Sequence, residues 1–152
     1  MTDLSTIFAG LALRNPIIIS SSGLTDTADK CRLLEDAGAG AVVLKSIFEE
    51  QIIQEHDQWY EAGSSEESDY LSTYLRAQSL SEHIGLIEET KRICTIPVIA
   101  SINCSTRSEW TEYAGLIEKA GADALELNIM DVQTEIAYEY GAYERKHIEI
   151  LN

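Results

Sequence analysis

The sequence is poor in basic residues, cysteine and proline. It contains 11 Lys or Arg against 26 Asp or Glu, for a net charge of −15, with 3 Cys and 2 Pro. The negative charge argues against nucleic acid or an anionic membrane surface as a partner, because both require a basic face. The cysteines form no Cys-x-x-Cys pair, so we expect neither a metal site nor a disulfide framework. A reducing, cytoplasmic location fits this cysteine usage.

Long apolar runs are also absent. No run approaches the roughly 20 residues that span a bilayer. The segment Met1–Leu4 lacks the basic and apolar regions of a signal peptide. The hydrophobic fraction of 45% over 152 residues is nevertheless enough to form one domain with a buried core. The sequence therefore predicts a globular domain whose partner is a small molecule rather than a membrane.

Short apolar runs alternate with helical patterns. The runs are continuous, as expected of parallel strands covered on both faces. We predict strands at 17–20, 41–44, 97–100 and 124–127. Helices are predicted over 27–37, from the capping box at Ser79 to about 93, from the capping box at Thr106 to 120, and over 133–151 with an interruption at Gly141. This alternation indicates an α/β fold with right-handed crossovers.

Two segments repeat the same local plan. Residues 35–45 and 118–128 each contain a helix end, a glycine turn, a strand and a polar residue. Repeated units of this kind favour a (β/α)8 TIM barrel over a doubly wound sheet. A complete barrel needs about 250 residues, and only four βα units are found. We therefore expect 1–152 to be the N-terminal half of one barrel domain, with an entry segment at 1–16. Its partner would be the missing C-terminal half or, as a homo-oligomer, a second copy.

An acidic insertion at 48–78 follows the second predicted strand. It is long for a βα connection, and a helix over 48–60 is one interpretation of its first part. An insertion at the carboxyl end of a barrel strand forms either a lid over the substrate or a peripheral surface. The sequence leaves both alternatives open.

Each predicted strand ends in polar, small or cationic residues. The carboxyl ends of parallel strands meet at one rim of an α/β fold, where such folds bind ligands. The pattern therefore predicts a pocket for a polar ligand. Lys45 has a structural alternative, an ion pair with Glu126, which is the one charged residue inside the fourth predicted strand. The residues at the strand ends are Ser20, Ser21, Ser22, Gly23, Lys45, Ser46, Ser101, Asn103 and Asn128.

Five motifs occur in order along the chain. Together they resemble the first half of the dihydroorotate dehydrogenase family, which includes the flavin domain of dihydropyrimidine dehydrogenase. The segment 99–105, followed by Trp110, is especially similar to the latter. The motifs are Asn15-Pro16, Ser21-Ser22-Gly23, Leu44-Lys45-Ser46, Ala100-Ser101-Ile102-Asn103 and the segment 122–128.

The resemblance implies an oxidoreductase of pyrimidine metabolism that acts on CH–CH groups. A (β/α)8 barrel of this type carries noncovalent FMN at its C-terminal mouth, and a hydride passes between a dihydropyrimidine-like substrate and the flavin. The resemblance places Ser21, Ser22 and Gly23 against the flavin. It places Lys45 near both flavin and substrate, as a catalytic and cofactor-binding residue, and it gives Ser46 a hydrogen bond to the flavin.

Further roles follow from the same resemblance. Asn103 and Asn128 would present amides to the flavin edge or the substrate ring. The family has a Ser-Cys-Pro-Asn-like loop after the fourth strand, which supplies the catalytic base. Here Asp131 stands at that place, either as the base or as the N-cap of the next helix.

Two departures from the family limit these expectations. The acidic insertion replaces a Gly-Leu-Pro-Asn-like substrate motif, and its carboxylates would repel anionic dihydroorotate. The loops that hold the FMN phosphate follow strands seven and eight in such barrels, so we expect this chain alone to hold FMN weakly and to be inactive. The alternative function is a non-catalytic half-barrel remnant or assembly module.

Overall fold

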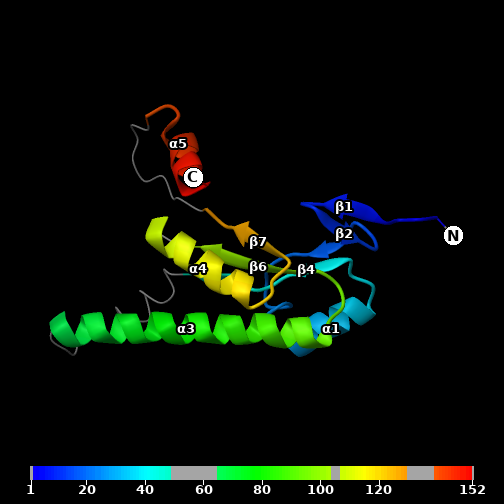
Figure 1. The fold of residues 1–152 in the computed structure, drawn as a ribbon, viewed down its shortest axis with the longest axis horizontal. Helices are drawn as coiled ribbons and strands as arrows, with labels where there is room; N and C mark the ends of the chain where they lie inside the picture. The colour runs from blue at the N-terminus through cyan, green and yellow to red at the C-terminus, as the bar shows by residue number, and fades with distance from the viewer. Residues whose placement is uncertain (1, 49–64, 104–106, 130–138, 152) are drawn as a thin grey trace.

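The computed structural model describes residues 2–48, 65–103, 107–129 and 139–151, which form a mixed α/β fold (Figure 1). The elements are β1 (Thr6–Phe8), β2 (Leu11–Leu13), β3 (Ile18–Ile19), α1 (Ala28–Asp36), β4 (Ala41–Val43), β5 (Ile47–Phe48), α3 (Ser65–Ile93), β6 (Val98–Asn103), α4 (Arg107–Lys119), β7 (Ala124–Leu127) and α5 (Ala142–Leu151).

Strand β6 is the centre of a parallel sheet. It pairs with β4 through Val98 and Ile99 on one side and with β7 along Ile99–Ile102 on the other. β3 extends the sheet beyond β4, and β5 pairs with the later part of β6. β4 and β5 pair with the same strand, β6, so with β5 counted as the continuation of β4 the neighbouring strands follow the chain order, joined by α1, α3 and α4. The predicted parallel α/β sheet is confirmed.

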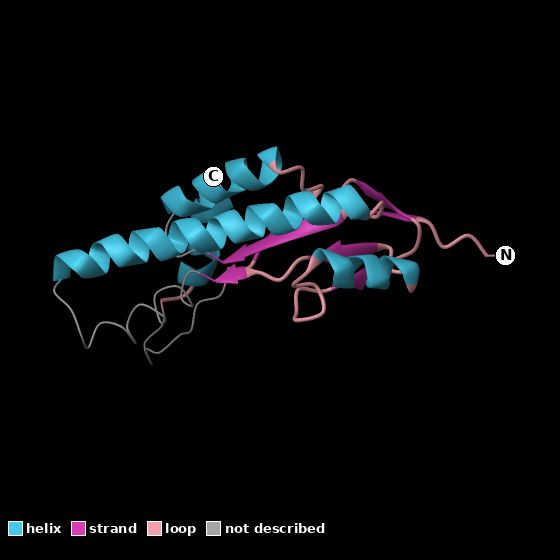
Figure 2. Ribbon diagram, turned by 90° about the horizontal axis from the view of Figure 1, so that it is seen from below, coloured by secondary structure: helices cyan, strands magenta, loops and turns pink. Residues whose placement is uncertain are grey.

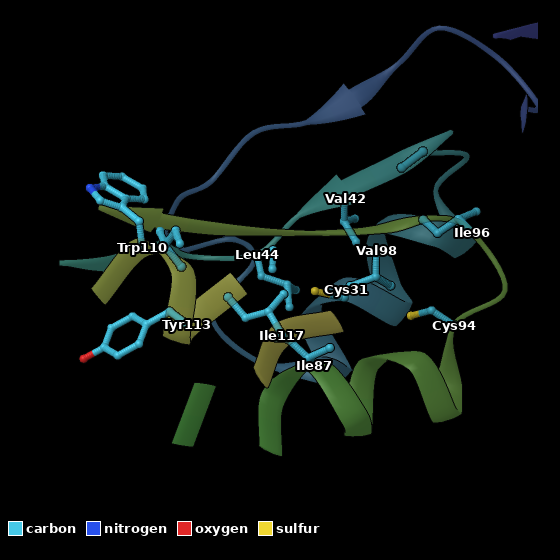
Figure 3. Close-up of a cluster of buried hydrophobic side chains, with 13 residues drawn as sticks. Cys31, Val42, Leu44, Ile87, Cys94, Ile96, Val98, Trp110, Tyr113 and Ile117 are labelled. Carbon is cyan, nitrogen blue, oxygen red and sulfur yellow. The ribbon is translucent and has the colours of Figure 1, made fainter. Parts of the chain in front are cut away.

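One face of the sheet packs against all three connecting helices. Figure 2 shows α3, the longest helix, lying along the strands. Alternate residues of β6 point to this face because side chains alternate along a strand. The cluster on this face (Figure 3) includes Cys31, Val42, Leu44, Ile87, Val98, Ala100, Ile102, Tyr113 and Ile117.

The opposite face of the sheet is covered by an N-terminal hairpin. Strands β1 and β2 pair antiparallel, and Leu13 packs with Val43 and Ile99 in a second, smaller cluster. Arg14 then donates hydrogen bonds to the carbonyl oxygens of Ala39 (2.9 Å) and Glu35 (2.5 Å). The entry segment 1–16 therefore contains structure that the sequence patterns did not predict, and it closes the sheet near the amino ends of its strands.

Helix α1 follows the predicted pattern closely. The Thr27 side chain accepts a hydrogen bond from the backbone N–H of Lys30, which caps the first turn. Gly38 follows the helix with φ of 105°, a conformation that favours glycine. At the helix end, buried Glu35 accepts hydrogen bonds from the backbone and hydroxyl of Thr95. Burial opposes ionisation of Glu35, but these bonds and Arg32 lower the pKa of its carboxyl.

Helix α3 corrects two predictions. The sequence pattern started a helix at Ser79, but α3 begins at Ser65 and runs through the Ser-x-x-Glu motif without a break. The motif satisfies N–H groups only at a helix start, and here the preceding turns already supply the hydrogen-bond partners. The second half of the acidic insertion 48–78 is therefore largely helical. A helix over 48–60 is wrong at its first residue, because Phe48 belongs to β5.

The remaining element predictions have mixed outcomes. The strand at 124–127 and the glycine stop at Gly121, with φ of 89°, are confirmed, and the strand at 41–44 is confirmed except that it ends at Val43. In the predicted last helix, residues 139–141 are not helical and α5 begins directly after Gly141. Thr106 and residues 130–138 lie outside the described residues. The described helices include none long and apolar enough to cross a membrane.

Buried polar groups mark the contact between α3 and the rest of the domain. His83 is 6% exposed, and its Nε2 atom has no hydrogen-bond partner. Burial lowers the pKa of His83 from 6.5 to about 4, because the charged imidazolium would lose its hydration.

The two described cysteines, Cys31 and Cys94, are free and buried, and burial raises the pKa of both thiols.

The buried imidazole predicts an acid-sensitive stability. The unfolded state binds a proton at His83 below its usual pKa of 6.5, whereas the folded state stays neutral down to about 4. The free energy of unfolding should therefore fall as the pH drops through this window, by about 2 kcal/mol at pH ~5 relative to pH ~7.5. Urea unfolding at both pH values measures the change. In His83→Leu this component should disappear, and an unchanged pH dependence in that variant would show that His83 does not cause it.

Candidate functional site

A cleft of about 560 Å³ lies at the carboxyl ends of the parallel strands. Residues from three separate strand ends meet there, as the sequence pattern predicts. The described residues that line it are Ser20, Ser21, Ser22, Gly23, Lys45, Ser46, Glu126, Leu127 and Asn128.

The loop after β3 is held by a compact turn. The hydroxyl of buried Thr25 donates to the Ser22 carbonyl oxygen and accepts the Ser22 N–H, each at 3.2 Å. The Thr25 carbonyl oxygen accepts the backbone N–H of Lys45 at 3.1 Å, which fixes the loop against the end of β4. Lys30 binds the Gly23 carbonyl oxygen at 2.9 Å. The loop is thus anchored from both sides and presents its serines to the cleft.

A one-residue shift in strand pairing shapes the neighbouring wall. Val43 of β4 pairs with Ile99, and Ile47 of β5 pairs with Ile102. The segment from β4 to β5 therefore advances four residues where β6 advances three (47 − 43 = 4; 102 − 99 = 3). The extra residue is a β-bulge, a feature that redirects side chains beside functional sites. The bulge brings Ser46 opposite Ser101, where a regular ladder would place Lys45.

Four side chains form a hydrogen-bonded chain across the sheet. The Oγ atoms of Ser21 and Ser46 are 3.0 Å apart, and those of Ser46 and Ser101 are 2.5 Å apart. Ser101 then donates to Oε1 of Glu126 at 2.6 Å. Ser101 is fully buried and Ser46 is 7% exposed, whereas Glu126 is exposed. The chain forms the polar floor of the cleft.

Lys45 is exposed at the rim of the cleft. Both Lys45 and Glu126 belong to the described residues, and no ion pair joins them; the carboxylate binds Ser101 instead. The structural alternative for Lys45 is therefore not observed. The positive charge of Lys45 instead acts on Asp26. The pKa of the Asp26 carboxyl is lowered first by a hydrogen bond from Lys30 and then by the positive charges of Lys30 and Lys45.

The other predicted site residues differ in position. Asn128 lines the cleft, and its N–H donates to the Ile102 carbonyl oxygen at 2.8 Å, which continues the β6–β7 ladder. Asn103 is 7% exposed at the end of β6 and is not among the described residues that line the cleft. Asp131 lies outside the described residues, so neither interpretation of it is tested.

The sequence patterns place Ser101 at the predicted pocket but do not predict its hydrogen bond to Glu126. Glu126, which lines the cleft, is considered there only as a partner for Lys45. The signal was the strand period: Ser101 and Glu126 are directly paired across β6 and β7, and both share the face of Ile99 and Ala124. A hydroxyl and a carboxylate paired on an inner face indicate a polar contact there. Within the described part of the chain, no group of three or more His, Cys, Asp or Glu is arranged to hold a metal.

Comparison with known proteins gives several similar sequences, although no protein-family model matches the chain. The catalytic subunit of dihydroorotate dehydrogenase B (NAD(+)) from Thermoplasma volcanium is 32% identical over 134 residues, covering 85% of this chain and 42% of that protein. The corresponding subunit from Methanosarcina acetivorans is 36% identical over 128 residues, covering 79% and 38%. The NAD-dependent dihydropyrimidine dehydrogenase subunit PreA from Escherichia coli is 30% identical over 133 residues, covering 83% and 32%.

The chain thus spans from about a third to about two fifths of the length of these relatives. All three are named as dehydrogenases of dihydroorotate or dihydropyrimidine, the two groups that the five sequence motifs indicate. The resemblance of this chain to the dihydroorotate dehydrogenase family is therefore confirmed by curated relatives that are 30–36% identical to it.

Proposed function

We propose that this chain is part of an FMN-dependent oxidoreductase that acts on a CH–CH bond of a dihydropyrimidine-like substrate in the cytoplasm. One observation carries the proposal. The motif residues that the family resemblance assigns to flavin or substrate come from separate strand ends, and six of them line a single cleft: Ser21, Ser22, Gly23, Lys45, Ser46 and Asn128.

We also propose that the fold is the first four βα units of a (β/α)8 barrel. Two observations support this. With β5 counted as the continuation of β4, the sheet order follows the chain order, and the cluster shared with α1, α3 and α4 lies on one face. Doubly wound sheets instead carry helices on both faces. In the described residues β3 pairs only with β4, and β7 only with β6, so two strand edges are available for further units.

The lining of the cleft offers groups that suit a flavin. A Cβ atom added at Gly23 would meet no other atom within 4 Å, and its φ is not in the left-handed region, so the chain's own packing does not require glycine there. A glycine at the cleft wall allows a planar ring to approach the backbone. Bound FMN would supply the two-electron redox chemistry that side chains lack.

The side chains would then bind and orient. Lys45 provides the one cationic group of the described cleft lining, placed to balance negative charge on flavin or substrate. Asn128 offers both an amide donor and a carbonyl acceptor to a ring edge. Asp131 stays a candidate base and Asn103 a candidate amide ligand on the resemblance alone.

A second candidate function is an assembly module, either as a homo-oligomer or with a complementary half of the barrel. Large apolar side chains are exposed on two elements. The N-terminal hairpin carries Ile7 (77% exposed) and Phe8 (53%), and α5 carries Ile148 (57%) and Leu151 (69%). Such side chains favour association. Sedimentation equilibrium distinguishes a stable assembly from a monomer.

Replacement of Lys45 tests the flavin site. In Lys45→Met the ammonium group is lost, so the affinity for FMN should fall by about tenfold, equivalent to ~1.4 kcal/mol. Quenching of FMN fluorescence measures the dissociation constant of FMN from the wild-type protein and from Lys45→Met. Lys119→Met, which removes an exposed lysine of α4, is the matched control and should leave the affinity unchanged. Equal affinities of wild type and Lys45→Met would contradict the assignment of Lys45.

The carboxylate in the cleft predicts a preference for neutral substrates. Glu126 lines the cleft and the chain carries a net charge of −15, so an anionic ring is disfavoured. In the completed, FMN-loaded barrel under anaerobic conditions, dihydrouracil should reduce the flavin faster than dihydroorotate does. Glu126→Gln should reduce the difference between the two rates of flavin reduction. Faster reduction by dihydroorotate would contradict this preference, and reduction by neither would contradict the proposed activity.

A further inference from the structure

The hydroxyl chain beneath the cleft has only one consistent hydrogen-bond direction. An ionised carboxylate accepts but cannot donate, so Ser101 must donate to Glu126. The single hydroxyl hydrogen of Ser101 is then used, and Ser46 must donate across the 2.5 Å contact. The same reasoning makes Ser21 donate to Ser46 across 3.0 Å.

The backbone is consistent with this order. The N–H of Ser46 donates to Oγ of Ser21 at 2.9 Å, so Ser21 already accepts one bond while its own hydrogen is directed to Ser46. Each serine hydroxyl carries one hydrogen and two lone pairs. After these bonds are counted, the unused capacity of Ser21 and Ser46 consists of lone pairs alone.

We propose that Glu126 is a positioning residue that fixes the direction of the Ser21–Ser46–Ser101 chain, so that its two members in the cleft lining, Ser21 and Ser46 (the serine wall), accept hydrogen bonds from a ligand and do not donate them. This wall would therefore select a ligand N–H group over a ligand carbonyl oxygen. Nothing in the proposed activity assigns such a role to Glu126 or Ser101. The inference rests on the proposed function only for the identity of the ligand.

The burial of the chain explains why one carboxylate controls the whole wall. Ser101 is fully buried, so its hydrogen has no alternative acceptor in water, and Ser46 is 7% exposed. Without Glu126, the Ser101 hydrogen would turn to Ser46, and the chain would reverse until Ser21 donated into the cleft. A buried hydroxyl left without an acceptor costs free energy, so the chain reorders as a unit.

Hydrogen-bond donors and acceptors are therefore separated within the cleft. Lys45 carries an ammonium group, which only donates, whereas Ser21 and Ser46 only accept. The predicted hydrogen bond between Ser46 and the flavin must accordingly be one that Ser46 accepts. A ligand edge with a carbonyl oxygen at Lys45 and an N–H at the serine wall satisfies both sides.

Neutron diffraction from perdeuterated crystals tests the direction without any ligand. In the wild-type protein the deuterium of Ser101 should point to Glu126, that of Ser46 to Ser101, and that of Ser21 to Ser46. Glu126→Gln keeps an acceptor oxygen, so the order should stay the same. In Glu126→Leu, which has no acceptor, the deuterium of Ser101 should point to Ser46. A deuterium on Glu126, or an unchanged order in Glu126→Leu, would overturn the proposal.

Ligand binding tests the consequence for recognition. Glu126→Gln and Glu126→Leu have the same net charge and differ in the acceptor, so they are matched to each other. The affinity for riboflavin, a neutral flavin probe, should be about fivefold weaker in Glu126→Leu than in Glu126→Gln, as expected for loss of one hydrogen bond. Equal affinities would overturn the selective role of the wall. If the completed barrel binds neither riboflavin nor FMN, the proposed function fails, and the deuterium positions still decide the inference.

Discussion

The pairing of β6 with strands on both sides is the constraint on which the rest of the structure depends. All six residues of β6 are buried, and the strand joins β4 and β5 on one side to β7 on the other. Its alternate residues serve two purposes: Val98, Ala100 and Ile102 pack against the helices, while Ser101 belongs to the polar floor of the cleft. A change in the register of this strand would exchange the two sets.

The bulge between β4 and β5 converts this scaffold into a site. A regular ladder would place Lys45 opposite Ser101, within the floor of the cleft. The extra residue moves Lys45 to the exposed rim and brings buried Ser46 onto Ser101. The ammonium group therefore stays in water, where a charge costs little, and the buried position receives a hydroxyl with hydrogen-bond partners. Cationic and accepting groups are separated within one cleft as a result.

Much of the fold follows from local sequence signals, whereas the finer geometry of the site does not. Continuous apolar runs predicted β4, β6 and β7, and Thr27 with Gly38 marked the ends of α1. The start of α3 was missed because Ser79 has the residue pattern of a cap without the geometry of one. The bulge depends on register with β6, and its paired residues Val43 and Ile99 lie 56 residues apart in sequence (99 − 43 = 56), so no local pattern could reveal it.

A crystal structure of the protein grown with FMN tests the central claim most directly, because it locates the flavin instead of inferring it from affinity. The account predicts the isoalloxazine ring in the cleft, against Gly23 and within reach of Lys45 and Asn128, with a ring N–H directed to the serine wall. Flavin bound elsewhere on the chain, or a ring whose carbonyl oxygen faces Ser21, would contradict it.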